Sequence, residues 1–210
     1  MFVWGGRGNS KFNVWRLDAD GSNPKQLTDG ISDARPVCSS DGKWAYYQDY
    51  LGSRIKLVPI DGGPAQIVPG TVLPTSFLSA LGIDVSHDGK LLAFTTTKTD
   101  QSPPERKIVL VNLEAGEDPP RRMLDPDPHI SASAGFTPDG KAVVYPILVN
   151  GAENIWLQPL NGPTGRLVTN FPSDAIQSFS FSPDGKSLGV LRIHTGSDVV
   201  LLTDSVSAAQ

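Results

Sequence analysis

Three histidines and one short acidic run are the side chains of this 210-residue chain with the most potential to hold a metal ion. Asp125, Asp127 and His129 alternate with two prolines, and carboxylate oxygens and imidazole nitrogens are common metal ligands. Proline at every second position also holds a chain extended, so an ordinary connector explains the run more simply. We expect no bound metal and no other cofactor.

Hydroxyl and glycine patterns give no stronger indication of catalysis. Serine or threonine recurs at positions 39, 86, 137 and 182, always two residues before an Asp-Gly pair, where a hydroxyl bonds turn backbone. The sequence has no Gly-x-Ser-x-Gly elbow, and a strand pattern follows the glycine-rich run 5–8 where a phosphate cradle needs a helix. We therefore predict no catalytic residue and no hydrolase, lyase or kinase activity for this chain.

The strands that carry these residues are predicted from a motif that occurs four times. It consists of an apolar residue followed by Ser/Thr-x-Asp-Gly-Lys. Its aspartates are Asp41, Asp88, Asp139 and Asp184, which lie 47, 51 and 45 residues apart. Asp-Gly closes a hairpin, and this spacing is typical of β-propeller blades of four antiparallel strands. The sequence predicts an all-β fold.

With the strands of a blade labelled A to D from the central channel outwards, the chain is expected to form BCD, three ABCD blades and ABC. The units cover roughly 1–31, 32–72, 78–127, 131–170 and 175–204, in one partial propeller domain over residues 1–210. Five units, of which the first and the last each lack a strand, predict an open arc. We expect this arc to be the C-terminal piece of a longer propeller. Open strand edges invite self-association, helped by an apolar patch at the gap near Trp4, Trp15, Val190 and Val200.

Composition excludes two classes of partner. The net charge is −4 with scattered basic residues, which argues against nucleic acid, and no apolar run reaches the ~20 residues of a membrane span, which argues against direct membrane insertion. The single cysteine, Cys38, stands where other copies have Val85, Phe136 and Phe181, so we expect a small buried apolar residue.

The repeats resemble the TolB-type, WD-repeat-like propeller repeat of bacteria. Residues 181–186 match its Ser-Pro-Asp-Gly-Lys half, and residues 14–21 with Leu27 and Thr28 match its second half. The ending 197–204 is similar to the propeller that ends acidobacterial serine/threonine protein kinases or winged-helix regulators. That resemblance implies a signalling context, with an extracytoplasmic location if the chain is tethered to a membrane kinase and a cytoplasmic one otherwise.

The remaining candidates for function lie on the face where the B–C loops and the D–A loops (28–35, 69–80, 126–133 and 170–177) emerge, here called the loop face. Such loops vary while blade cores repeat, and aromatic and arginine side chains dominate protein interfaces. The candidate contact residues are Arg35, Tyr50, Phe77, His129, Phe171, Asp174 and His194.

The expected function is a non-enzymatic interaction or sensor module for a protein, a peptide or a small molecule. The alternatives are the propeller of a prolyl-oligopeptidase-type hydrolase and a metal-dependent propeller lyase such as an oligogalacturonate lyase.

Overall fold

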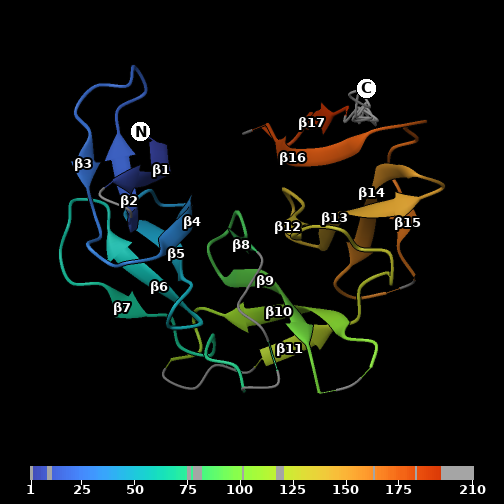
Figure 1. Cartoon of the computed structure of the whole chain (residues 1–210), viewed down its shortest axis with the longest axis horizontal. Coiled ribbons are helices and arrows are strands. Elements are labelled where there is room, and N and C mark those ends of the chain that lie inside the picture. Colours follow the sequence, from blue (N-terminus) through green and yellow to red (C-terminus); the bar gives the residue numbers. More distant parts are fainter. Residues whose placement is uncertain are drawn as a thin grey trace, which may run out of the picture.

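Five β-sheets follow one another along an arc in the computed structural model (Figure 1). The structure describes residues 2–8 (backbone only), 11–74, 77, 82–100, 102–116, 121–162, 164–182 and 184–194. Each sheet is an antiparallel blade, and no helix occurs among these residues. The arc is open between the N-terminal blade and the strands β16 and β17 (Figure 1).

The strand order confirms the predicted all-β propeller of four-stranded blades. Blade 1 has three strands, blades 2 to 4 have four each, and two strands of blade 5 fall within the described residues. The strands are β1 (Phe2–Gly8), β2 (Lys11–Leu17) and β3 (Lys25–Gln26); β4 (Asp33–Cys38), β5 (Trp44–Asp49), β6 (Arg54–Pro59) and β7 (Gln66–Ile67); β8 (Gly82–Val85), β9 (Leu91–Lys98), β10 (Glu105–Asn112) and β11 (Arg121–Leu124); β12 (Gly135–Phe136), β13 (Ala142–Val149), β14 (Ala152–Pro159) and β15 (Arg166–Leu167); β16 (Ala175–Phe181) and β17 (Leu188–Ile193). The expected third strand of blade 5, at 199–202, lies outside the described residues.

The four predicted hairpin turns share one set of hydrogen bonds, shown here for blade 4. The Thr137 hydroxyl donates to Asp139 Oδ1 at 2.6 Å and accepts from the Ala142 amide at 3.1 Å, while Asp139 Oδ1 also accepts from the Lys141 amide. Gly140 has φ 65° and donates to the Thr137 carbonyl. Ser39, Ser86 and Ser182 make the equivalent bonds in the other blades.

These bonds set the ionisation of the turn aspartates. The neighbouring hydroxyl, followed by the Lys amide, lowers the pKa of each carboxyl below its ordinary value at Asp41, Asp88, Asp139 and Asp184. Hydrogen bonds to a charged form favour that form. The repeated Ser/Thr-x-Asp-Gly-Lys motif is therefore a folding device that works best with its carboxylate ionised.

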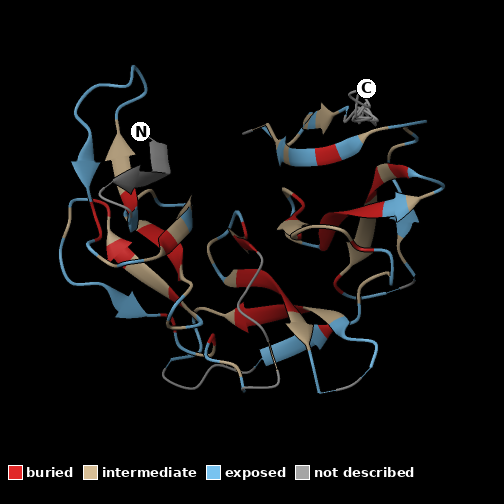
Figure 2. Ribbon diagram, viewed as in Figure 1, coloured by how far each residue is buried: buried red, intermediate tan, exposed pale blue. Residues whose placement is uncertain are grey.

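The hydrophobic cores lie between blades. One joins blades 1 and 2 around Val14 and Tyr47, and the next joins blades 2 and 3 around Phe94. A third joins blades 3 and 4 around Tyr145, and the fourth joins blades 4 and 5 around Ile176. Figure 2 shows the buried residues gathered on the middle strands, whereas the outermost strands β3, β7 and β15 are exposed.

Two expectations about packing are wrong. Val190 packs with Leu188 against the blade 4 core, because alternate residues of β17 face opposite sides, so Leu191 (55% exposed) faces outwards instead. Cys38 is half-buried rather than buried. Trp15 is half-buried, and the Trp4 side chain and Val200 lie outside the described residues.

Candidate functional site

The innermost strands of blades 2 to 5 border a cavity of about 760 Å³, here called the inner groove. It is open to solvent and runs along β4, β8, β12 and β16. Its lining mixes apolar side chains such as Ile83 and Phe179 with hydroxyl and charged side chains such as Ser178 and Asp84. A few polar groups on an apolar wall are typical of binding sites.

Arg35 enters the inner groove from blade 2, as the only candidate contact residue that lines it. It lies where the pairing of β4 with β5 shifts register, and its φ of 52° is unusual for a residue with a side chain. A Cβ built on Gly82 of blade 3 would lie 3.5 Å from Arg35 Nη1 and 2.2 Å from Ser133 Oγ of blade 4. The absent side chain at Gly82 leaves the space in which groups from three blades meet.

Asp84 provides the opposite charge two residues further along β8. Its Oδ2 accepts a hydrogen bond of 2.7 Å from the Phe136 amide of blade 4. Burial raises the pKa of the Asp84 carboxyl above its ordinary value, although bonds from the Phe136 and Val85 amides oppose the rise. A Cβ on Gly135 would lie 3.2 Å from Oδ2, so this glycine also makes room for a charged group.

The sequence reasoning missed Asp84, although a signal was present. The residue before the last apolar position of each inner strand is Val37, Asp84, Gly135 or Ser180. An acid within the otherwise apolar run of residues 83–85, at a position where no other copy is charged, departs from the repeat.

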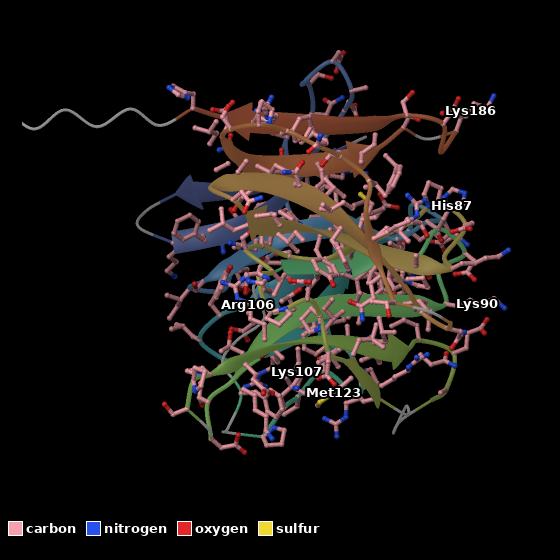
Figure 3. All side chains as sticks on the ribbon, turned by 90° about the vertical axis from the view of Figure 1, so that its right-hand side faces the viewer. His87, Lys90, Arg106, Lys107, Met123 and Lys186 are labelled. Carbon is pink, nitrogen blue, oxygen red and sulfur yellow. The ribbon has the colours of Figure 1, made fainter. Side chains whose placement is uncertain are left out.

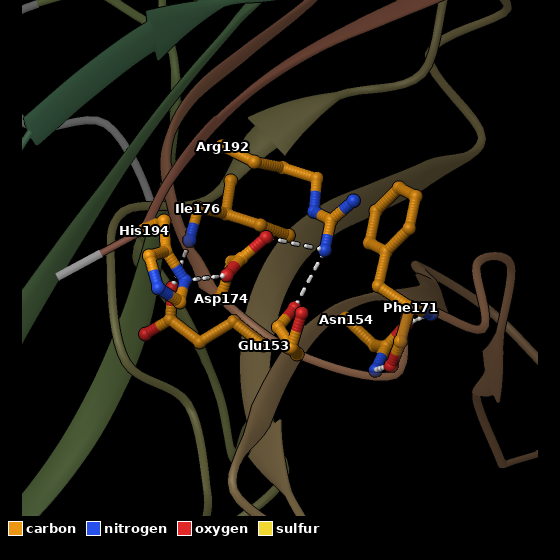
Figure 4. Close-up of polar contacts among 8 residues, drawn as sticks. Glu153, Asn154, Phe171, Asp174, Ile176, Arg192 and His194 are labelled. Atoms are coloured by element: carbon orange, nitrogen blue, oxygen red, sulfur yellow. Dashed lines mark hydrogen bonds and ion pairs between the residues drawn. The ribbon is translucent and has the colours of Figure 1, made fainter. Parts of the chain in front are cut away.

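Three further candidates meet at the loop face between blades 4 and 5 (Figure 4). Asp174 lies between two basic side chains, with Oδ1 2.8 Å from His194 Nδ1 and Oδ2 accepting from Arg192 Nη2 at 2.8 Å. The Arg192 guanidinium lies 4.3 Å from the centre of the Phe171 ring. The hydrogen bond with His194, and then the charge of Arg192, lower the pKa of Asp174 despite partial burial.

Glu153 ties the same loops to blade 4. Its Oε2 accepts from the Ile176 amide at 2.5 Å, and its own amide donates to the Asp174 carbonyl at 3.0 Å. Asp174 has φ 73°, a strained value that these contacts hold in place. Arg192 and Glu153 were not among the sequence candidates, because Arg192 reaches Asp174 only across the β16–β17 pair and Glu153 reaches Ile176 only when blades 4 and 5 pack together.

The other candidates lie apart from both clusters. Tyr50 is half-buried and fixes its loop through a backbone bond from its amide to the Ser32 carbonyl. Phe77 is half-buried and borders a small cavity beside Phe94. His129 is exposed, with Nδ1 2.9 Å from Asp127 Oδ1.

The opposite end of the blades carries the hairpin turns. Figure 3 shows His87, Lys90 and Lys186 at this end and Arg106 at the other. His87 lines the end of the inner groove near the turns. Within the part of the chain that the structure describes, no three His, Cys, Asp or Glu side chains converge to form a metal site.

The described ranges also contain no helix with the length and apolar character needed to cross a membrane.

No family model matches the chain, and no curated protein matches its sequence. Solved structures match its fold. TolB from Acinetobacter baumannii is 20% identical, with a TM-score of 0.73 over 93% of this chain and 47% of TolB. An oligogalacturonate lyase from Vibrio parahaemolyticus is 16% identical, with a TM-score of 0.70 over 91% of this chain and 55% of the lyase. A chain of a nidogen/laminin complex is 13% identical, with a TM-score of 0.66 over 90% of this chain and 69% of its own length.

The chain thus spans about half the length of the TolB and lyase chains. The fold is a TolB-like β-propeller fold.

Proposed function

We propose that this chain is a non-enzymatic interaction module that binds a protein or peptide segment in the inner groove and on the adjoining loop face. The observation that carries the proposal is the groove itself, about 760 Å³ in volume, with apolar side chains and the charged side chains of Arg35, Asp84 and Asp184 in its lining. Its open side admits a continuous chain as well as a small molecule. One structural neighbour belongs to a nidogen/laminin complex, which is consistent with a protein partner.

The non-enzymatic part of the proposal rests on how the reactive groups are used. The four repeated hydroxyls hold their own turns, and the Asp174–His194 pair has its carboxylate fixed by Arg192. Catalysis by acyl transfer needs a nucleophile within hydrogen-bond reach of such a pair. The Ser173 hydroxyl lies in this cluster and hydrogen-bonds the Asp174 carboxylate.

A turnover screen tests this part directly. Esterase, peptidase and oligogalacturonide substrates are offered to the purified chain, with and without added divalent metal. We expect no turnover above buffer. Activity that disappears in His129→Ala or His194→Ala would overturn the proposal in favour of the hydrolase or lyase alternative.

Peptide selection tests the binding part. A random peptide library displayed on phage is selected on the wild-type chain, and the selected peptides are titrated against Ser178→Trp, which places an indole in the groove from an exposed position on β16. Gln66→Trp, on the exposed outer strand β7, is the matched control. Loss of binding in Ser178→Trp alone supports the proposal, and failure to select any peptide contradicts it.

We further propose that the module serves a larger signalling protein. This rests on the sequence resemblance of residues 197–204 to kinase- and regulator-linked propellers. The genomic reading frame around the chain tests it: a kinase or winged-helix domain in that frame supports the proposal, and an enzyme domain of another class contradicts it.

A further inference from the structure

The charged side chains Arg35, Asp84 and Asp184 line the inner groove, and the first two, of opposite sign, lie at successive levels of β8. The Arg35 guanidinium reaches the level of Gly82, as shown by the 3.5 Å between its Nη1 and a Cβ built on that glycine. The Asp84 carboxyl belongs to the residue two positions further along β8. Residues two apart on a strand point to the same side, so both charges serve one face of the groove.

A glycine lies beside each of these two charged groups and leaves room for it. A side chain at Gly82 would collide with Ser133, and one at Gly135 would crowd Asp84 Oδ2. Glycine in a strand interior weakens the strand and often marks a place where another chain or a ligand comes close. Two such glycines, each beside a charged group in one cavity, are consistent with a built binding surface.

The opposite wall of the groove suits an extended chain. β16 runs along it, and its Ser178 and Ser180 side chains are exposed, while Phe179 between them is half-buried against blade 4. All three side chains line the groove, so an extended peptide laid here would meet hydroxyl groups and an apolar surface from β16 and the side chains of Arg35 and Asp84 from β4 and β8.

The spacing of the two charged groups indicates which side chains a peptide ligand should carry and how far apart they should lie. Two residues along a strand span about 6.6 Å, the same repeat at which an extended peptide presents side chains on one face. We propose that the inner groove binds an extended peptide that carries an acidic side chain for Arg35 and, two residues away on the same face, a basic side chain for Asp84. This rests on the proposed peptide-binding function and specifies the chemical class of the peptide.

Synthetic peptides test the pattern. The probe is a blocked five-residue peptide with glutamate second and lysine fourth among serines and threonine, together with its reversed sequence. In the matched analogues, glutamine replaces glutamate or norleucine replaces lysine. We expect one charged order to bind and each neutral analogue to bind about tenfold more weakly, as expected for the loss of one partly desolvated charge contact.

Two groove variants assign each contact. The Asp84→Asn variant should bind the norleucine analogue as well as it binds the lysine peptide. The Arg35→Gln variant should bind the glutamine analogue as well as it binds the glutamate peptide. Asparagine keeps an oxygen acceptor for the Phe136 amide, so the tie between blades 3 and 4 survives. Asp41→Asn, which makes the same charge change at an exposed turn aspartate, is the matched control and should bind like the wild type.

The backbone amide of Phe136 gives a site-specific readout, because its proton points at Asp84. Its NMR shift should move on adding the charged peptide to the wild-type chain and stay in place with the norleucine analogue. Equal binding of charged and neutral peptides would overturn the proposed pattern while leaving peptide binding intact. Absence of binding by every probe, in a chain that selects peptides from the library, would also overturn the pattern; a chain that selects none would refute the proposed function itself.

Discussion

The hairpin turns and the inner groove use the same residue type in opposite ways. At the turns, Asp41, Asp88, Asp139 and Asp184 are exposed, and neighbouring hydroxyl and amide donors lower the pKa of each carboxyl. In the groove, burial raises the pKa of Asp84. The fold stabilises the ionised form at the turns, including Asp184, which also lines the groove, and disfavours it at buried Asp84.

The difference separates the chemistry that builds the fold from the chemistry left for a ligand. A feature present in each of blades 2 to 5 with the same hydrogen bonds serves the blade, however reactive its side chains look in the sequence. A charge that occurs in one blade, and that lacks a favourable environment, needs another explanation. Three substitutions and one change of pH test this difference.

The largest effect is expected at a turn glycine. Gly140 has φ 65°, and a Cβ there would meet nothing within 4 Å, so Gly140→Val should act through backbone strain alone. We expect the free energy of unfolding to fall by about 1–3 kcal/mol in urea titration. Gly140→Asn, which tolerates the left-handed region, should lose less. Equal stability of the valine variant would show that the turn does not need its glycine.

The second largest loss of stability is expected when a turn hydroxyl is removed. Thr137→Val keeps the shape of the side chain but leaves the amide of buried Ala142 without its acceptor. An unsatisfied buried donor costs about 1–3 kcal/mol, and we expect the lower half of that range in urea titration. Thr137→Ser restores the hydroxyl and should recover most of the loss. An unchanged valine variant would mean that the repeated hydroxyl does not stabilise the turn.

Asp84→Asn should have a smaller effect, in the opposite direction. The variant removes a charge that burial disfavours and keeps the bond from the Phe136 amide. We expect the free energy of unfolding at neutral pH to stay level or rise by up to about 1 kcal/mol. Asp139→Asn, which removes a charge that its turn stabilises, should lower stability instead. A clear loss of stability in Asp84→Asn would make this carboxylate a structural ion.

The smallest effect is expected in the pH dependence. A carboxyl whose pKa is raised by folding costs stability at neutral pH, and the cost disappears as the pH falls through its folded value. Asp84 and the buried Asp33 are of this kind. The turn aspartates have lowered values, so their contribution is complete above the ordinary value of 3.8 and is lost only below it.

Stability should therefore rise slightly from neutral pH towards pH 4 and fall at more acidic pH. Urea midpoints measured across this range check the sign. The rise should be smaller in Asp84→Asn and unchanged in Asp41→Asn. A midpoint that falls steadily from neutral pH would contradict the assignment of raised pKa values to these two buried groups.

The turns were predictable from the sequence because their bonds join residues at most five positions apart. Asp-Gly sets the hairpin, and the hydroxyl two residues earlier reaches both the aspartate and the returning strand. The candidate contact residues were chosen by type and loop position, and the structure brings three of them, Phe171, Asp174 and His194, into one cluster.

Asp84 could not be assigned in this way, because its partner amide is 52 residues away in the chain. The direction of Val190 and the half-exposure of Cys38 likewise depend on which side of a strand meets the next blade. A single sequence gives the alternation of side chains but does not say which neighbour covers each side.

The placement of the cores between blades also determines how this molecule should come apart. Each blade contributes one wall to the core on either side, so its stability depends on its immediate neighbours. Blades 2, 3 and 4 each share two cores, whereas blades 1 and 5 share one within the described residues. Opening should therefore begin at the two blades that flank the gap and spread inwards. Amide hydrogens of β9 and β10 should be the slowest to exchange, and those of β2 and β17 the fastest.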